Sequence, residues 1–204
     1  MNEAIKRGAY GGIVGLVLIL PMLILEEMSL HGLLSSFGIT CFVVLMAVAG
    51  FATLVSNYGV IKVAEKHAEK YLLWTSWAVL ICAGLSTFLH ISYLLDPQVK
   101  LIGIARYSTV GIETIILFLQ AFAFARLSLY YGEMALRLRD FQVVLVISAW
   151  VVFIGAFFSL YRNPQVLLLM LILLVVAGVS SIASSLLGIK LLFRAANASY
   201  TAPK

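Results

Sequence analysis

The stretch QVLLLMLILLVVAGVSSIASSLLGI, from Gln165 to Ile189, contains no charged side chain. An α-helix needs about 20 predominantly apolar residues to cross the hydrocarbon core of a bilayer, because each residue adds roughly 1.5 Å of rise. The stretch meets this length, and it predicts a membrane-spanning helix over residues 165–193. A chain built around such a segment is expected to be an integral membrane protein.

The composition of the whole chain leads to the same expectation. Of its 204 residues, 63% are hydrophobic and only 11% are charged, whereas soluble domains average about half apolar and a quarter charged. So few charged groups cannot coat a water-facing surface, and the lipid bilayer is therefore the expected partner. The net charge of +5 does not indicate nucleic acid binding, because the basic residues are scattered between apolar runs and cannot follow a phosphate backbone.

Five further apolar segments precede this one. Together they predict an all-α, polytopic integral membrane protein, in which one transmembrane domain covers residues 1–204 and contains six transmembrane helices. The predicted spans are residues 8–25, 33–56, 71–95, 101–129, 141–161 and 165–193. Charged or proline-containing stretches separate them, and Pro21 predicts a kink within the first span.

The Lys and Arg residues predict the orientation, because basic residues that flank membrane spans are retained in the cytoplasm. With a cytoplasmic N-terminus, eleven of the 14 basic residues fall on the cytoplasmic side. These are Lys6, Arg7, Lys62, Lys66, Lys70, Arg126, Arg137, Arg139, Lys190, Arg194 and Lys204. We therefore expect a multi-pass protein of the cell membrane with both termini in the cytoplasm. The basic segment 62–70 is expected to be a solvated helical hairpin beside the lipid headgroups.

A short internal repeat suggests how the six spans are organised. The sequence FATL at residues 51–54, followed by YG at 58–59, recurs as FARL at 124–127, followed by YG at 131–132. Both copies lie at the predicted cytoplasmic end of an even-numbered span. They favour three helical hairpins in the same orientation, related by an axis along the membrane normal.

Glu113 is the acidic residue nearest the middle of a predicted span. A carboxylate at this depth costs about 2.5 to 3.5 kcal/mol on insertion scales, so the side chain is expected to face protein or water. Arg106 and Gln120 lie seven residues to either side and share nearly the same helix face. One interpretation makes Glu113 a proton or cation site, with Arg106 and Gln120 along the same path. The other makes it a structural carboxyl group that is hydrogen-bonded to a neighbouring helix.

Two histidines give a third possibility. His90 lies near the outer end of the third span, and His31 begins the second span on the same side. Their proximity would suit haem b or a quinone, although no ligand spacing typical of a metal site supports this. We therefore expect no cofactor, with haem b as the alternative.

The last span carries small residues at three- and four-residue spacing. They include Gly178, Ser181, Ser185 and Gly188. In lipid, this pattern allows helix backbones to approach closely. It predicts either internal helix packing or an interface with another subunit.

No catalytic constellation is recognisable, since the chain has no phosphate-binding loop, metal-ligand motif or acid–base pair. We therefore do not expect an enzyme. The first functional hypothesis is an accessory or scaffolding subunit of a larger membrane complex, bound to other membrane subunits or to further copies of itself. The alternatives are a small ion, proton or solute transporter or channel that uses Glu113, and a haem- or quinone-associated redox subunit that uses His90 and His31.

Overall fold

The computed structural model describes residues 1–30, 33, 35–95, 100–157 and 164–198, and their regular structure is entirely helical. The helices are α1 (Asn2–Leu30), α2 (Ser36–Lys66), α3 (Lys70–Leu95), α4 (Lys100–Arg126), α5 (Ser128–Tyr131), α6 (Glu133–Phe157) and α7 (Pro164–Asn197). Within these ranges, α2, α3, α7 and the Asn2–Met22 part of α1 are long and apolar enough to cross a membrane. The expected all-α class and the expected membrane protein are therefore confirmed.

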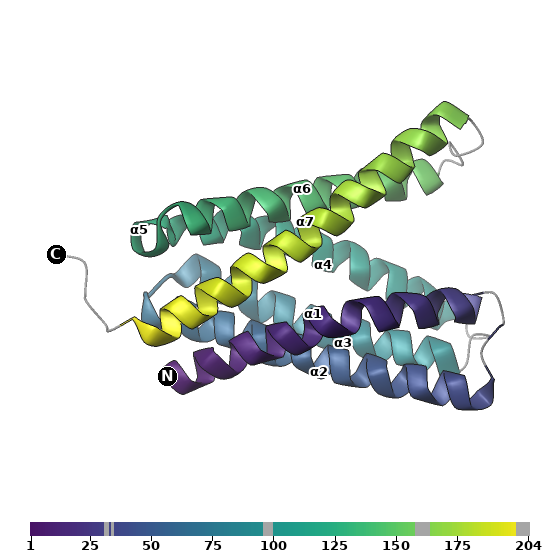
Figure 1. Cartoon of the computed structure of the whole chain (residues 1–204), viewed down its shortest axis with the longest axis horizontal. Helices are drawn as coiled ribbons and strands as arrows, with labels where there is room; N and C mark the ends of the chain where they lie inside the picture. Colours follow the sequence, from purple (N-terminus) through teal and green to yellow (C-terminus); the bar gives the residue numbers. More distant parts are fainter. Residues whose placement is uncertain (31–32, 34, 96–99, 158–163, 199–204) are drawn as a thin grey trace.

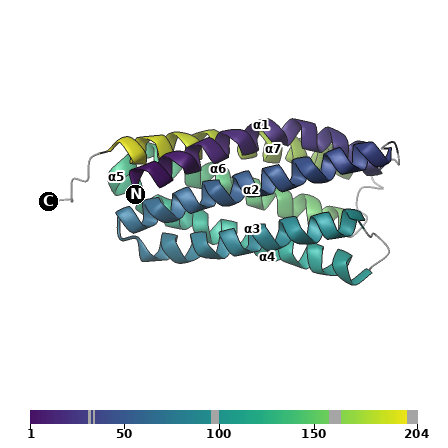
Figure 2. The same cartoon turned by 90° about the horizontal axis from the view of Figure 1, so that it is seen from below.

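The six long helices form a closed ring (Figures 1 and 2). Each helix packs on the next: α1 on α2, α2 on α3, α3 on α4, α4 on α6, α6 on α7, and α7 on α1. The ring thus consists of the hairpins α1–α2, α3–α4 and α6–α7. We call the end that holds the start of α1 and the end of α7 the termini end.

The two copies of the internal repeat lie in different surroundings. On α2, Phe51 is 68% exposed, whereas the matching Phe124 on α4 is 3% exposed. Helix α2 continues past its copy to Lys66, but α4 ends at Arg126 and the chain turns at Gly132 with a φ of +60°. Glycine adopts this conformation without steric cost. Helix α4 thus ends three residues before the expected end of the span 101–129, and the two matching phenylalanines differ in burial.

The backbones of α1 and α2 approach each other closely at Gly8 and Gly59. A Cβ atom added to Gly8 would lie 2.6 Å from the Cα atom of Gly59. The spacing of small residues predicted close helix packing on α7 instead. However, a Cβ atom added to Gly178 or to Gly188 would stand in open space. Within this chain, these two glycines therefore do not serve close helix contact. A subunit interface at Gly178 stays a prediction.

The two ends of the ring differ in packing. Near the termini end, large apolar side chains are fully buried, among them Ile5, Leu72 and Leu191. Towards the opposite end α7 diverges from α1 (Figure 1), and side chains such as Leu168 and Val175 are more than half exposed. The structure is thus closed and well packed at the termini end and more open at the other.

Candidate functional site

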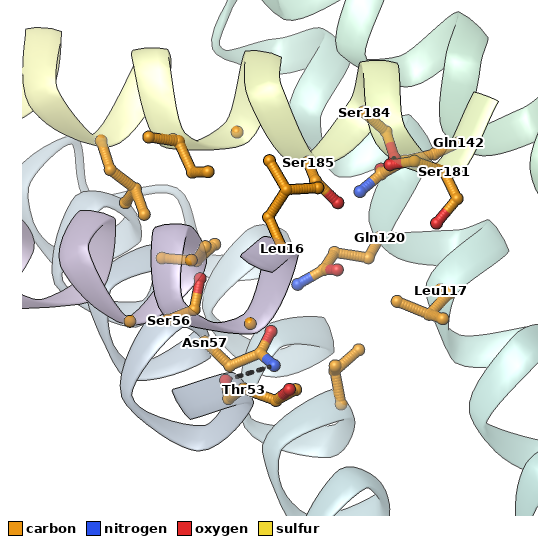
Figure 3. Close-up of a pocket in the computed structure, with 18 of the residues that line it drawn as sticks. Leu16, Thr53, Ser56, Asn57, Leu117, Gln120, Gln142, Ser181, Ser184 and Ser185 are labelled. Atoms are coloured by element: carbon orange, nitrogen blue, oxygen red, sulfur yellow. Dashed lines mark hydrogen bonds between the residues drawn. The ribbon is translucent and has the colours of Figure 1, made fainter. Parts of the chain in front are cut away.

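A half-open cavity of about 520 Å³ lies between the helices of the ring, and all six long helices contribute to its lining. Its volume falls within the range of about 300 to 1,000 Å³ that is typical of small-molecule sites. Many of the lining side chains are polar. They are Glu113 and the residues that Figure 3 labels as Thr53, Ser56, Asn57, Gln120, Gln142, Ser181, Ser184 and Ser185. Hydrogen-bonding groups therefore gather at this cavity, while the surface of the ring also exposes many large apolar side chains.

Glu113 contributes the one charged group among the described residues that line the cavity. It lies on α4, and the hydroxyl group of Ser86 on α3 donates a hydrogen bond to its carboxyl group. Cys82 lies one turn before Ser86 on the same helix and is also close enough to interact with Glu113 electrostatically. The structural interpretation requires a hydrogen-bond partner on a neighbouring helix, and Ser86 is such a partner. The functional interpretation requires access to a polar space, and Glu113 lines the cavity.

Gln120 lies two turns further along α4 and also lines the cavity. Its side chain is only 2% exposed, and its Nε2 atom donates a 3.0 Å hydrogen bond to Oγ of Ser76 on α3. The spacing of seven residues between Glu113 and Gln120 therefore does place both side chains at the same cavity. Arg106 was expected on this stripe, but its side chain lies outside the described part of the chain.

Gln142, which sequence reasoning did not single out, faces the same cavity from α6. Its Oε1 atom is buried and has no hydrogen-bond partner among the described residues. A buried acceptor without a partner costs about 1 to 3 kcal/mol, so a donor from water or a ligand would be favourable here. The signal available in the sequence was a lone glutamine at the start of the apolar run 141–154.

The small residues of α7 form part of this wall. Ser181, Ser185 and Gly188, which were predicted to pack against other helices, line the cavity. Figure 3 shows the Ser185 side chain directed towards the space between α7 and α1. Small side chains at these positions leave room, because a larger residue would occupy the cavity. The pattern on α7 thus accompanies the cavity, while α7 also packs on α6 and α1.

A second polar cluster lies at the termini end, around Lys66. The segment 62–70 was expected to be solvated, but Lys66 is only 4% exposed. Its Nζ atom donates hydrogen bonds to the carbonyl oxygens of Ala195 and Ala198, both at 2.7 Å, and to Oδ1 of Asn2 at 3.2 Å. The last carbonyl groups of a helix lack partners within the helix, and a cation complements their partial negative charge. Lys66 thus joins the end of α2 to the ends of α7 and α1.

His67 extends this cluster towards α5. Its Nε2 atom lies 2.7 Å from the hydroxyl oxygen of Tyr131, and its ring lies 4.0 Å from the ring of Tyr130. Burial raises the pKa of Tyr131 to about 12, so the phenol stays protonated near neutral pH. Burial, with a smaller effect from Lys66, lowers the pKa of His67 below its ordinary value. The sequence interpretation missed this cluster because Lys66 and His67 sit in a run of charged residues that is typical of a solvated surface.

The haem or metal interpretation gains no new support. His90 lies half-buried on α3 and has an interaction partner, while His31 lies outside the described residues. Among the residues that the structure describes, no three His, Cys, Asp or Glu side chains are grouped so that they could hold a metal ion. A site that uses both histidines stays a prediction.

Comparisons with known proteins give no relative for this chain: no family model matches it, and neither a curated protein nor a solved structure is significantly similar.

Proposed function

We propose that the protein is a transporter or channel for a small polar solute and that the central cavity is its binding site. The observation that carries this proposal is the set of polar side chains that α2, α4, α6 and α7 direct to one cavity between the helices. Polar groups are costly inside a membrane and are found there mainly along substrate or ion pathways. A purely structural helix bundle would fill its centre with apolar side chains, as this chain does near Leu72 and Leu191.

The proposal includes six membrane spans. Helices α4 and α6 are 27 and 25 residues long and close the ring between α3 and α7. Because they pack side by side with helices that are long and apolar enough to cross, we propose that they cross as well. The same proposal places the termini end in the cytoplasm, since basic residues such as Arg7, Arg137 and Arg194 lie there.

Cavity-filling variants provide the test. Gly188 lines the cavity and has open space at its Cβ position, so Gly188→Leu would project into the cavity without displacing the backbone. Gly178 lies on the same helix, has the same open space and does not line the cavity, which makes Gly178→Leu a matched control. Both substitutions are expected to keep or raise stability, because glycine disfavours a helix interior by about 1 kcal/mol relative to alanine.

The assay is uptake into proteoliposomes of guanidinium, urea, glycerol and glycine, compared with protein-free vesicles. We expect the wild-type protein and Gly178→Leu to carry at least one of these solutes, and Gly188→Leu to lose most of that flux. Absence of flux for the whole panel, or equal flux in Gly188→Leu, would contradict a transport role for the cavity.

The accessory-subunit hypothesis is kept as a second proposal because of α7. Over residues 167–179 most of its side chains are exposed and apolar, including Leu171, Leu174 and Val179. Such a surface suits lipid or the helices of another membrane subunit. Purification in mild detergent with native mass spectrometry separates the two, because a complex subunit retains a partner at fixed stoichiometry and a lone monomer would argue against this second proposal.

A further inference from the structure

We infer that the solute is a small organic cation that carries N–H donors, such as an amine or a guanidinium compound. This inference rests on the proposed function, because it assigns a substrate class to the same cavity. Three properties of the cavity support it: the sign of its charge, the balance of its hydrogen-bonding groups, and its size.

Any charge that the described lining residues carry is negative. Among the described residues around the cavity, Glu113 is the one ionisable acid, and no Lys, Arg or His side chain accompanies it. Interactions between charges are much stronger in a low-dielectric interior than in water. A solute with a positive charge would therefore be attracted to Glu113, whereas an anion would be repelled and would find no cationic partner in the lining.

The hydrogen-bonding groups of the lining include an acceptor without a partner among the described residues. The amide nitrogen of Asn57 donates to the carbonyl oxygen of Thr53 at 3.0 Å, and that of Gln120 donates to Ser76 at 3.0 Å. One N–H group of each amide is thus engaged within the protein. In contrast, Oε1 of Gln142 is a buried acceptor without a partner among the described residues. A ligand that brings N–H donors would satisfy it.

The size of the cavity favours an organic cation over a bare metal ion. Metal ions such as Ca²⁺ are held by six to eight oxygen atoms at about 2.3 to 2.6 Å, which requires a tight cage. A space of about 520 Å³ is too wide for its walls to enclose an ion of this kind. It is suited to a molecule with several non-hydrogen atoms.

Three probes of similar size separate the contributions of charge and of donors. Guanidinium has a positive charge and six N–H bonds, urea has nearly the same planar shape without the charge, and tetramethylammonium has the charge without N–H donors. We expect saturable guanidinium uptake by wild-type proteoliposomes. Uptake of urea and of tetramethylammonium should be at least about tenfold weaker, which corresponds to 1.4 kcal/mol of binding free energy.

Variants test the named residues. Glu113→Gln keeps the shape of the side chain and removes its charge, and it should lower guanidinium uptake at least about tenfold. Gln142→Leu removes the acceptor and should weaken guanidinium uptake several-fold, so it tests the inference even if Glu113→Gln does not fold. Glu133→Gln is the matched control, because Glu133 is exposed, does not line the cavity and pairs with Arg137 at 3.0 Å. Uptake by this variant should equal that of the wild type.

Each adverse result has a separate meaning. Equal uptake of urea and guanidinium would overturn the requirement for charge, and equal uptake of tetramethylammonium would overturn the requirement for N–H donors. Unchanged guanidinium uptake in folded Glu113→Gln would remove Glu113 as the counter-charge. Flux of glycerol or glycine without guanidinium flux would refute this inference and leave the proposed transport function standing, whereas absence of all flux would refute both.

Discussion

Replacing Lys66 by methionine should destabilise the fold clearly, although this residue lies in a charged segment that looks like a solvated surface. Methionine has a similar length and keeps the apolar contacts of the side chain. It removes the ammonium group, which donates to the carbonyl oxygens of Ala195 and Ala198 and to Oδ1 of Asn2. The variant therefore separates the hydrogen bonds of Lys66 from its packing.

The expected magnitude follows from the burial of these bonds. Hydrogen bonds to charged groups contribute about 1.5 to 3 kcal/mol each, and a buried acceptor left without a partner costs about 1 to 3 kcal/mol. The bond to Ala195 is buried, while the bonds to Asn2 and Ala198 are partly buried and can be replaced in part by water. Removal of the ammonium group from a buried site also relieves some desolvation cost. We therefore expect Lys66→Met to lower the free energy of unfolding by roughly 2 to 4 kcal/mol.

The measurement is unfolding in mixed micelles by titration with sodium dodecyl sulfate, followed by tryptophan fluorescence. Lys62→Met is the matched control, because Lys62 lies one turn earlier on α2 and forms an exposed pair with Glu65 at 2.7 Å. Exposed pairs contribute about 0 to 1 kcal/mol, so this variant should unfold almost like the wild type. Equal free energies of unfolding for the two variants would refute the role assigned to Lys66.

Two further predictions concern helix packing and pH. Gly8→Ala should lower the free energy of unfolding by about 1 to 3 kcal/mol, because the added Cβ atom would lie 2.6 Å from the Cα atom of Gly59. Gly178→Ala is the control and should be neutral or stabilising, because its Cβ atom would stand in open space. Similar free energies of unfolding for the two variants in the same titration would contradict the close contact. Burial lowers the pKa of His67, with a smaller contribution from Lys66, so the unfolded chain takes up the proton first as the pH falls. The stability that His67 contributes is thus present above its unfolded pKa of about 6.5 and declines as the pH falls below it. His67→Gln should flatten this decline between pH 7.5 and 5.5, and an unchanged pH profile would contradict it.

The sequence predicted best those features that depend on a single helix. The apolar run 165–189 predicts a long helix, and α7 spans it. The spacing of Glu113 and Gln120 places both on one helix face, and both line the cavity. In contrast, the spacing of small residues on α7 does not distinguish a tight contact from an open space at Gly188. That choice depends on how far α7 stands from its neighbours.

The environments of Lys66 and Gln142 were equally hidden, for a physical reason. In a soluble helix the apolar side chains mark the buried face, but lipid is as apolar as a helix interface, so a membrane helix has apolar residues on its outer and inner faces alike. The pattern along one helix therefore does not say which face turns inwards.

Composition and the lengths of the apolar runs by themselves determined that the chain is an all-helical membrane protein, because burial in lipid is the only way to satisfy so many apolar side chains. The tertiary structure alone decided that the helices close into a ring, that α7 leaves space opposite α1, and that Lys66 caps the end of α7. These features join residues far apart in the chain, since Lys66 and Ala195 come from different helices. They depend on the distances between helices, which no local pattern encodes.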